Sequence, residues 1–419
     1  MKKYETYKDS GLEWLGMVPE HWGIVPLKYL LSEPLQYGAN ESADNCNPSE
    51  PRYIRITDIT EDGKLRKSTY RTLPYQKAEG YMLKKGDILF ARSGATVGKT
   101  FIFEEDYDAC FAGYLIKASC NEKLLPMFLY YFTSSNSYEN WKNSTFNQAT
   151  IQNIGADKYC TLPIPTPSSE EQEGIINFLS HNVAQIDALI SEKEKMVEDL
   201  KAYRSSLITE TVTKGLDKDV KMKDSGVEWI GKMPQNWKLL KLKRIVNLKS
   251  GTSLTSDRIL DEGKYQVFGG NGPRGYIDDY TNEGNFVLIG RQGALCGNIN
   301  YANGKFWATE HAIICYPLKK IDTIWLGETL RAMNLNQYSI SAAQPGLAVE
   351  RINELLIPTP SISEQKEISS YLKLKITQIE SAISEQEHQL SDLKSYKSSL
   401  ITEAVTGKID LRDWQTKKS

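Results

Sequence analysis

The sequence predicts an α+β protein built from two mixed α/β domains, each followed by a long helix, with the two helices pairing as an antiparallel coiled coil. Three observations predict this architecture. Blocks of sequence occur twice, two segments carry a long apolar stripe of helical spacing, and the stretches before them contain short β-like runs and many glycines. The length of 419 residues fits two or more domains, because single cores rarely grow beyond roughly 250 residues.

Two sets of similar blocks reveal an internal duplication. The block KDSGLEWLGMVPEHW begins at residue 8 and returns as KDSGVEWIGKMPQNW at residue 223, an offset of 215 residues. The blocks IPTPSSEEQ and LKAYRSSLITE begin at residues 164 and 200 and return at residues 357 and 393, an offset of 193 residues. Two copies are too few for a solenoid, so the halves are expected to be related by a pseudo-two-fold.

The stretches between the repeated blocks are predicted as mixed β structure. Six apolar runs indicate strands, namely YIRITDI (53–59), GDILFA (86–91), YLIKA (114–118), YQVFG (265–269), NFVLIG (285–290) and HAIICY (311–316). We therefore assign residues 1–160 and 216–355 to the two α/β domains, and residues 161–215 and 356–419 to the helical segments. If the chain were a duplicated enzyme, the stretches between the repeated blocks, here called the middles, would both keep the catalytic residues. The two middles barely match, which disfavours a duplicated enzyme.

Each helical segment is predicted to hold one helix of roughly 45 residues, or about 65 Å. Pro165 and Pro167 end the preceding element, Ser168 or Ser169 can cap the first helix, and Gly215 can stop it. A helix this long cannot bury its stripe on a small domain alone, so we expect the two to pair. The apolar residues assigned to the stripe are Leu179, Ile186, Leu189, Met196, Leu200, Tyr203 and Leu207 in the first helix, and Leu372, Ile379, Leu393, Tyr396 and Leu400 in the second.

Composition narrows the class of protein. Hydrophobic residues make up 40% and charged residues 25%, as in ordinary globular proteins, and no run is long enough to span a membrane. Neither a signal peptide nor a C-x-x-C pair is found, so we expect a cytoplasmic protein with six free cysteines. The net charge of −2 is unusual for a dedicated nucleic-acid binder, but it is compatible with local basic patches or with binding alongside partners.

Two glycine-rich stretches resemble nucleotide-binding motifs, but neither meets the full requirements of its motif. LFARSGATVGKT (89–100) has Ser93 where the phosphate-binding loop needs its first glycine, and a β-like run follows where a helix must begin. GNGPRG (270–275) matches G-x-G-x-x-G but contains Pro273 and precedes no apolar helix. Since nucleophile-elbow, metal-binding and methyltransferase motifs are also missing, the sequence favours a binding role over catalysis.

The two middles share one local pattern, in which RSGATVG (92–98) aligns with RQGALCG (291–297). Arg92 faces Arg291, each directly after a β-like run and on a glycine-rich turn. Such an arginine can reach a phosphate or a guanine edge, and the other interpretation is a structural arginine paired with a carboxylate. Its presence in both halves favours a functional role.

These features together resemble the specificity subunit of type I restriction–modification systems, along essentially the whole chain. The resemblance rests on the duplicated KDSG-x-EW head, GDILFARSGATVGK, YQVFGGNGPRGY, ATEHAII and the IP-x-P-x-x-x-EQ block before each helix. It implies that residues 1–160 and 216–355 are target-recognition domains, each reading half of a bipartite, asymmetric site in double-stranded DNA. It also implies that the helices form a spacer between these domains.

The resemblance further implies the partners and the residues that read DNA. Two methyltransferase subunits would carry S-adenosylmethionine, and restriction–translocase subunits would bind ATP and Mg²⁺, so this chain itself would be non-catalytic. The candidate DNA-binding residues are Arg92, Ser93, Thr96 and Lys99 in the first domain, and Asn271, Arg274, Arg291 and Gln292 in the second. Three alternatives stay open: a related restriction system with another cleavage partner, a stand-alone DNA-modifying enzyme, and a coiled-coil scaffold that binds no DNA.

Overall fold

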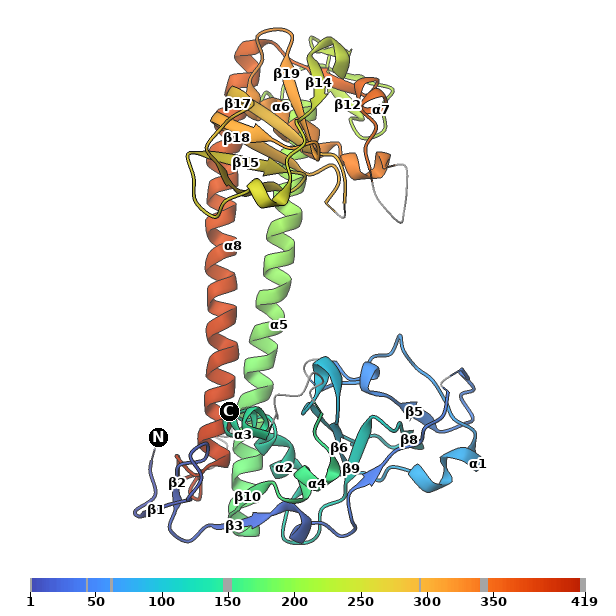
Figure 1. Ribbon diagram of the computed structural model, residues 1–419, viewed down its shortest axis with the longest axis vertical. Coiled ribbons are helices and arrows are strands. Elements are labelled where there is room, and N and C mark those ends of the chain that lie inside the picture. Colours follow the sequence, from blue (N-terminus) through green and yellow to red (C-terminus); the bar gives the residue numbers. More distant parts are fainter. Residues whose placement is uncertain are drawn as a thin grey trace. The chain divides into compact units, whose positions relative to one another are not determined.

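The structure is a computed structural model that describes residues 2–42, 44–60, 63–145, 153–293, 295–339 and 346–414. The chain forms two compact units. Unit 1 comprises residues 1–193 and 388–419, and unit 2 comprises residues 194–387. The long helices α5 (Ser169–Lys214) and α8 (Ile362–Val405), labelled in Figure 1, each contribute one part to unit 1 and the other part to unit 2.

Unit 1 holds a four-stranded sheet of order β4-β9-β6-β7 and three two-stranded pairs, β1-β2, β3-β10 and β5-β8. Its strands are β1 (Tyr7–Asp9), β2 (Met17–Pro19), β3 (Gly23–Pro26), β4 (Gln36–Tyr37), β5 (Arg52–Ile54), β6 (Ile88–Ala91), β7 (Thr100–Ile102), β8 (Ala109–Phe111), β9 (Leu115–Ala118) and β10 (Pro163–Thr166). Its shorter helices are α1 (Tyr75–Ala78), α2 (Pro126–Phe132), α3 (Asn136–Thr145) and α4 (Ala156–Cys160).

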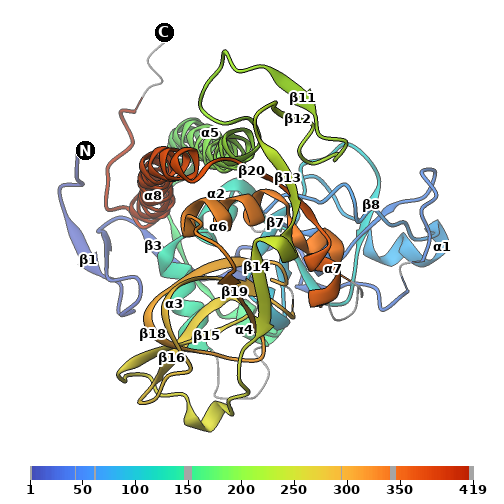
Figure 2. The same ribbon diagram turned by 90° about the horizontal axis from the view of Figure 1, so that it is seen from above.

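Unit 2 holds a six-stranded sheet of order β14-β19-β17-β18-β15-β16 and the pairs β11-β12 and β13-β20. Its strands are β11 (Met222–Asp224), β12 (Lys232–Pro234), β13 (Lys238–Lys241), β14 (Val246–Ser250), β15 (Tyr265–Gly269), β16 (Gly272–Ile277), β17 (Asn282–Gly290), β18 (Ile299–Ala308), β19 (Ala312–Pro317) and β20 (Leu356–Thr359). Its shorter helices are α6 (Thr323–Ala332) and α7 (Val349–Asn353), and Figure 2 shows α6 between the sheet and the long helices.

The strand orders confirm the internal duplication, and they extend it to the middles. The order β4-β9-β6-β7 of unit 1 corresponds to β14-β19-β17-β18 of unit 2, although the sequences of these strands barely match. Parallel pairing also recurs, between β5 and β8 in unit 1 and between β15 and β18 in unit 2. A sheet tolerates such divergence because each strand position needs only an apolar residue of suitable size.

All six predicted strands are present, and the first is much shorter than predicted. The run predicted over 53–59 ends as a strand at Ile54, and a 3-10 turn follows at Ile56–Asp58. Asp58 causes the break, because its carboxylate accepts hydrogen bonds from the backbone nitrogen of Arg55 at 2.8 Å and from its guanidinium. This local pairing replaces the next step of the strand ladder.

The repeated S-x-x-E-Q block starts both long helices in the same way. Ser168 and Glu171 form a reciprocal capping box at the start of α5, with both bonds at 3.2 Å. Ser361 and Glu364 repeat it at the start of α8. The residue after each glutamate ties the helix to its domain, since the Gln172 amide oxygen accepts from the backbone nitrogen of Leu125, just before α2. The cap of α5 is therefore Ser168.

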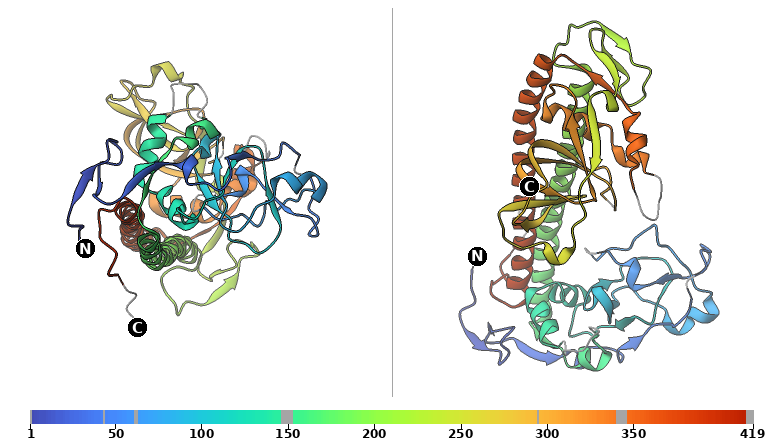
Figure 3. Two further views of the ribbon diagram at one scale, coloured as in Figure 1. Left: turned by 90° about the horizontal axis from the view of Figure 1, so that it is seen from below. Right: turned by 45° about the horizontal axis from the view of Figure 1, so that its top comes forward.

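The long helices run antiparallel within each unit and lie side by side in the views of Figure 3. In unit 1, Asp187 pairs with Lys397 at 2.6 Å and Lys193 donates to Gln389 at 2.6 Å, so residue numbers rise on one helix as they fall on the other. In unit 2, Arg204 pairs with Glu380 at 3.3 Å. The ion pairs of Asp187 and Glu380 are counterparts at the repeat offset of 193 residues.

The predicted stripe is partly wrong, because four of its residues do not lie in the seam between the helices. Leu189, Met196, Tyr203 and Tyr396 are 46%, 41%, 55% and 53% exposed. The apolar residues of the α5 seam are instead Leu179, Val183, Ile186, Ile190, Val197, Leu200 and Leu207. With the polar residues Lys193 and Arg204, which pair with α8, they alternate steps of four and three residues. A shift of one residue turns a side chain by about 100° around the helix, so Leu189 lies beside the seam position Ile190 and points away from it.

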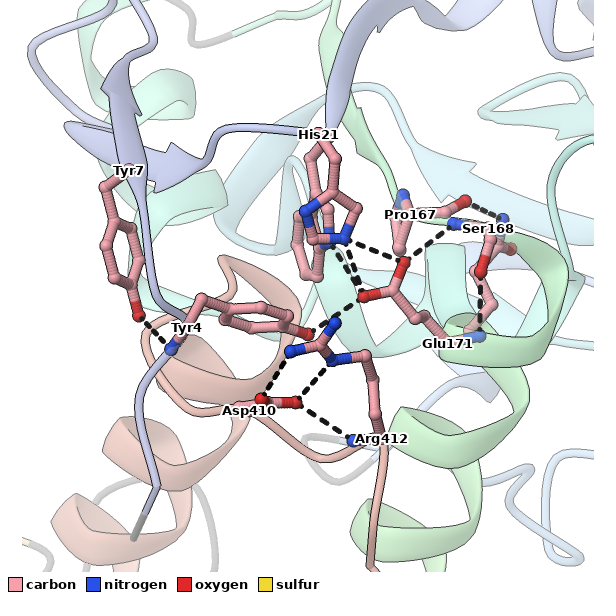
Figure 4. Close-up of polar contacts among 10 residues, drawn as sticks. Tyr4, Tyr7, His21, Pro167, Ser168, Glu171, Asp410 and Arg412 are labelled. Carbon is pink, nitrogen blue, oxygen red and sulfur yellow. Dashed lines mark hydrogen bonds and ion pairs between the residues drawn. The ribbon is translucent and has the colours of Figure 1, made fainter.

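The two chain ends of unit 1 meet at the start of α5, as Figure 4 shows. The Glu171 carboxylate, 8% exposed, accepts hydrogen bonds from the Tyr4 hydroxyl at 3.2 Å and the Trp22 indole at 3.3 Å, and His21 Nε2 lies 2.9 Å away. Arg412 lies over the Tyr4 ring at 5.0 Å. A buried carboxylate needs such partners, so this cluster holds the first and last described segments together.

Candidate nucleic-acid interface

Both units contain the same turn at the end of a central strand. In unit 1, β6 ends at Ala91 and the chain returns as β7, with Gly98 nitrogen donating to Ala91 oxygen at 2.8 Å. In unit 2, β17 ends at Gly290, and Gly297 nitrogen donates to Gly290 oxygen at 2.8 Å. The residues inside each turn, 92–97 and 291–296, are the ones aligned from the sequence. We call these segments the strand-end turns.

The shared glycines are explained by backbone conformation. Gly94 and Gly98 have φ of 76° and 81°, and their counterparts Gly293 and Gly297 have φ of 92° and 86°. Residues with a side chain rarely adopt this left-handed region, so glycine is favoured at all four positions. The glycines thus build a turn that leads into a strand, and no helix follows to bind a nucleotide phosphate. The GNGPRG stretch likewise turns into β16.

The arginines that open the two turns have matching backbone environments. Arg92 donates its backbone N–H to Tyr114 oxygen at 3.1 Å and accepts from Ile154 nitrogen at 2.8 Å. Arg291 donates to His311 oxygen at 2.8 Å and accepts from Leu347 nitrogen at 2.9 Å. The structure therefore confirms that the two arginines occupy equivalent places in the two units.

The side chains of both arginines lie against the last residue of a neighbouring edge strand. The Arg92 guanidinium lies 4.9 Å from the centre of the Tyr37 ring, and Arg291 donates to the Ser250 hydroxyl at 3.2 Å. Within the described residues, neither arginine forms an ion pair, and the buried Arg92 Nε has no hydrogen-bond partner. This geometry disfavours a purely structural ion pair and leaves guanidinium N–H groups for a ligand.

The other residues predicted in unit 1 lie around the turn without joining one cluster. Ser93 is partly buried and forms a β-bridge with Asn153, and Thr96 ends the 3-10 turn Gly94–Thr96. Lys99 lies elsewhere, because it lines a cavity of about 680 Å³ between this turn, α3 and the long helices. Sequence proximity alone had grouped Lys99 with Arg92.

The residues predicted in unit 2 come together more closely. Gln292 is exposed, and its amide oxygen lies 3.0 Å from His311 Nδ1. The Asn271 amide oxygen accepts from the Asn298 amide nitrogen at 2.8 Å. Arg274 lies on β16 with an exposed side chain, three residues beyond Asn271. Four chain segments thus place polar side chains on one edge of the six-stranded sheet.

Sequence reasoning missed several polar residues of this edge. His311 and Asn298 complete the two hydrogen-bonded pairs, and Glu310 precedes His311 in the turn between β18 and β19. The side chains of Asn300 and Thr309 each bury a polar atom that finds no partner in the described part of the chain. The pairing of β17 with both β18 and β19 brings these residues to the edge that holds Arg291, so no local sequence signal could have found them.

The described residues offer little support for other kinds of site. They contain no group of three or more His, Cys, Asp or Glu side chains placed to hold a metal ion, and no helix among them is long and apolar enough to cross a membrane. All six cysteines are free thiols. Burial raises the pKa of Cys110 and Cys120 to about 12, so these thiols stay protonated and unreactive at neutral pH.

Comparison with known proteins identifies the family. The chain matches the family described as type I restriction modification DNA specificity domain twice, over residues 36–199 and 234–388. The chain belongs to this family. The two matches include both strand-end turns and most of both long helices.

Individual relatives agree with this assignment along most of the chain. The specificity subunit of the type I restriction enzyme EcoprrI from Escherichia coli is 29% identical, covering 76% of this chain and 79% of its own. That of MjaVIII from Methanocaldococcus jannaschii is 24% identical, covering 98% and 97%.

Two solved structures share the fold. A chain from a study of complex assembly and conformational transition of the type I R-M system superposes with a TM-score of 0.73, at 16% identity, covering 93% of this chain and 98% of its own. The HsdS subunit from Thermoanaerobacter tengcongensis superposes with a TM-score of 0.50, at 17% identity, covering 94% and 98%.

Proposed function

We propose that this chain is the cytoplasmic DNA-recognition subunit of a type I restriction–modification complex. Unit 1 and unit 2 each read one half of a bipartite, asymmetric site in double-stranded DNA. Partner methyltransferase subunits bind S-adenosylmethionine, and partner restriction–translocase subunits bind ATP and Mg²⁺. The chain itself is not a catalyst in this proposal, since its two nucleotide-like loops both continue into strands.

One observation carries this proposal. The two units share the same backbone arrangement at the strand-end turn, but they place different side chains around it. The arginine and the glycines recur at the strand-end turn. Around them Ser93 is replaced by Gln292, Lys99 by Asn298 and Tyr114 by His311. Amides, hydroxyls and arginines on a common frame are the groups that read base edges, and different sets read different bases. Two such sets in one chain suit an asymmetric site of two halves.

Docking of the methyltransferase subunits is supported by apolar side chains that the helix seam leaves uncovered. Tyr203 and Tyr396 are counterparts at the repeat offset of 193 residues, and both are more than half exposed. Leu189 adds an exposed apolar side chain on α5. Tyrosine is enriched at protein interfaces because its ring is apolar and its hydroxyl is polar, so these residues are suited to contact a partner.

The decisive experiment is methylation-sensitive genome sequencing of cells that express this chain with its methyltransferase. We expect one methylated motif with two defined halves separated by a fixed number of unspecified bases. A single undivided motif would contradict the proposal that each unit recognises one half of the DNA site. A scaffold that binds no DNA would give no sequence-specific methylation at all. A different cleavage partner would leave the methylated motif intact and change only the restriction phenotype.

The isolated chain provides a second check. We expect no binding of S-adenosylmethionine by isothermal titration to the purified chain, and binding only once the methyltransferase is added. Saturable binding to the chain alone would favour the stand-alone modifying enzyme.

A further inference from the structure

Backbone hydrogen bonds show which residues of the turn between β18 and β19 in unit 2 are equivalent to residues of the turn between β8 and β9 in unit 1. Thr309 nitrogen donates to Phe268 oxygen at 2.9 Å, as Ala112 nitrogen donates to Ile54 oxygen at 2.9 Å. Two residues further on, the oxygen of His311 accepts from Arg291, as that of Tyr114 accepts from Arg92. The residue between them is therefore equivalent in the two units, and it is Glu310 in unit 2 and Gly113 in unit 1.

Glu310 lies within the polar edge of unit 2. Its Oε1 lies 3.4 Å from His311 Nε2, and His311 Nδ1 in turn lies 3.0 Å from the Gln292 amide oxygen. The other carboxylate oxygen, Oε2, is buried and finds no hydrogen-bond partner among the residues described. A buried acceptor left unpaired costs free energy, so its persistence here points to a donor that arrives with a ligand.

Unit 1 fills the same place with another side chain. A Cβ atom built on Gly113 would lie 2.0 Å from the amide oxygen of Asn40. The Asn40 side chain thus occupies the space into which a residue at position 113 would extend. Asn40 follows β4, whose last residue, Tyr37, lies against Arg92. The two units therefore put a carboxylate and an amide at one equivalent place near the reader arginine.

We infer that Glu310 accepts a hydrogen bond from the exocyclic amino group of a base in the half-site read by unit 2. Asn40 is its counterpart for the half-site read by unit 1. This inference rests on the proposed function and assigns residues beyond the strand-end turns. In the major groove only cytosine and adenine present an amino donor, while guanine and thymine present acceptors that a carboxylate repels. A phosphate is excluded as the ligand of Glu310 by its negative charge.

The test replaces Glu310 with glutamine in the complex of this chain with its methyltransferase, and determines the methylated motif by sequencing. Glutamine keeps the size of the side chain but adds a donor. We expect discrimination at one base pair of one half-site to fall roughly ten- to a hundredfold, with the other half-site unchanged. Cytosine at the affected position identifies N4 as the donor, and adenine identifies N6.

A matched control and an independent variant keep the inference falsifiable. Glu283→Gln makes the same chemical change on exposed Glu283, at the opposite end of β17, and we expect the wild-type motif. Asn40→Asp removes the amide donor of unit 1 and leaves only acceptor oxygens, and we expect a change at one position of the other half-site. If Glu310→Gln does not fold, Asn40→Asp decides the question.

Three outcomes would overturn the inference. The first is an unchanged motif in both Glu310→Gln and Asn40→Asp. The second is a loss spread evenly over all positions, which would indicate a general loss of binding. The third is a changed slope of log binding constant against log salt in Glu310→Gln, since reading a base amino group alters no phosphate contact. If the wild-type complex methylates no bipartite motif, the proposed function itself fails. If the wild-type complex methylates such a motif and the variants leave it unchanged, only the inference about Glu310 and Asn40 fails.

Discussion

At the scale of single residues, the two arginines of the strand-end turns contact neighbouring side chains and form no ion pair with any described residue. Arg92 lies against an aromatic ring and Arg291 against a hydroxyl, and both side chains keep N–H groups available. A planar guanidinium can contact two acceptors of guanine at once, which an ammonium group cannot do. The type of residue is therefore expected to matter as much as its charge.

We predict that Arg92→Ala and Arg291→Ala each weaken specific DNA binding by about 1–3 kcal/mol, measured by competition between specific and non-specific duplexes. Arg92→Lys should restore little of this loss, because it returns the charge without the planar donor fork. Unaltered binding and methylation in both alanine variants would show that the strand-end turns do not contact DNA.

Glu171 makes stability depend on pH. Burial raises the pKa of this carboxyl, but hydrogen bonds from His21, Ser168 and Trp22 outweigh burial and hold the pKa below its usual 4.5. A depressed pKa means that the ionised form stabilises the fold above pH 4.5, and that this contribution disappears as the pH falls through the folded-state value.

We therefore expect Glu171→Gln to lower the free energy of unfolding by about 1.5–3 kcal/mol at pH 7, measured by urea titration. The difference from wild type should shrink below pH 4.5, as the wild-type carboxyl becomes protonated. Glu173→Gln, an exposed glutamate on the same helix, is the control and should change little. A difference that stays constant from pH 7 to pH 3 would argue against the linkage.

At the scale of elements, the long helices show how a stripe read from sequence can be displaced by one residue. Leu189 and Ile190 are both apolar, and so are Met196 and Val197, so composition alone does not choose between them. The steps of four and three residues choose Ile190 and Val197, because only that spacing keeps the seam facing the partner helix. The partner stripe on α8 is required to make that choice.

This seam makes a matched pair of substitutions informative. We predict that Ile186→Ala, at a side chain 6% exposed, costs about 2–5 kcal/mol of stability in urea or thermal unfolding. Leu189→Ala, 46% exposed, should cost less than about 0.5 kcal/mol while reducing retention of the methyltransferase subunit. Equal destabilisation by the two substitutions would place Leu189 back in the seam.

At the scale of the whole molecule, the duplicated chain is expected to act as two readers joined by a spacer. α5 has 46 residues and α8 has 44, and each contributes to both units. The length of these helices is therefore the physical quantity that would determine the gap between the half-sites. The length of a helix is set by its number of residues, because each residue adds a rise of 1.5 Å.

We predict that adding four residues within 192–201 of α5, with four more in the facing stretch 380–389 of α8, lengthens each helix by about 6 Å. The gap in the methylated motif should grow by about two base pairs, since each base pair of DNA rises about 3.4 Å. An unchanged gap would contradict the role of the helices as a spacer. An insertion of the same four residues after Lys319, in the exposed loop between β19 and α6, should leave the gap unaltered.

The sequence by itself determined the duplication, the two long helices with their caps, and the strand-end arginines with their glycines. These features are local or repeated, since a capping box, a helical stripe and a left-handed glycine each depend on residues a few positions apart. Only the tertiary structure decided the seam register, the separation of Lys99 from Arg92, and the assembly of Gln292, His311 and Glu310. Those depend on which strands and helices lie side by side, and contacts between distant segments leave no signal in local spacing.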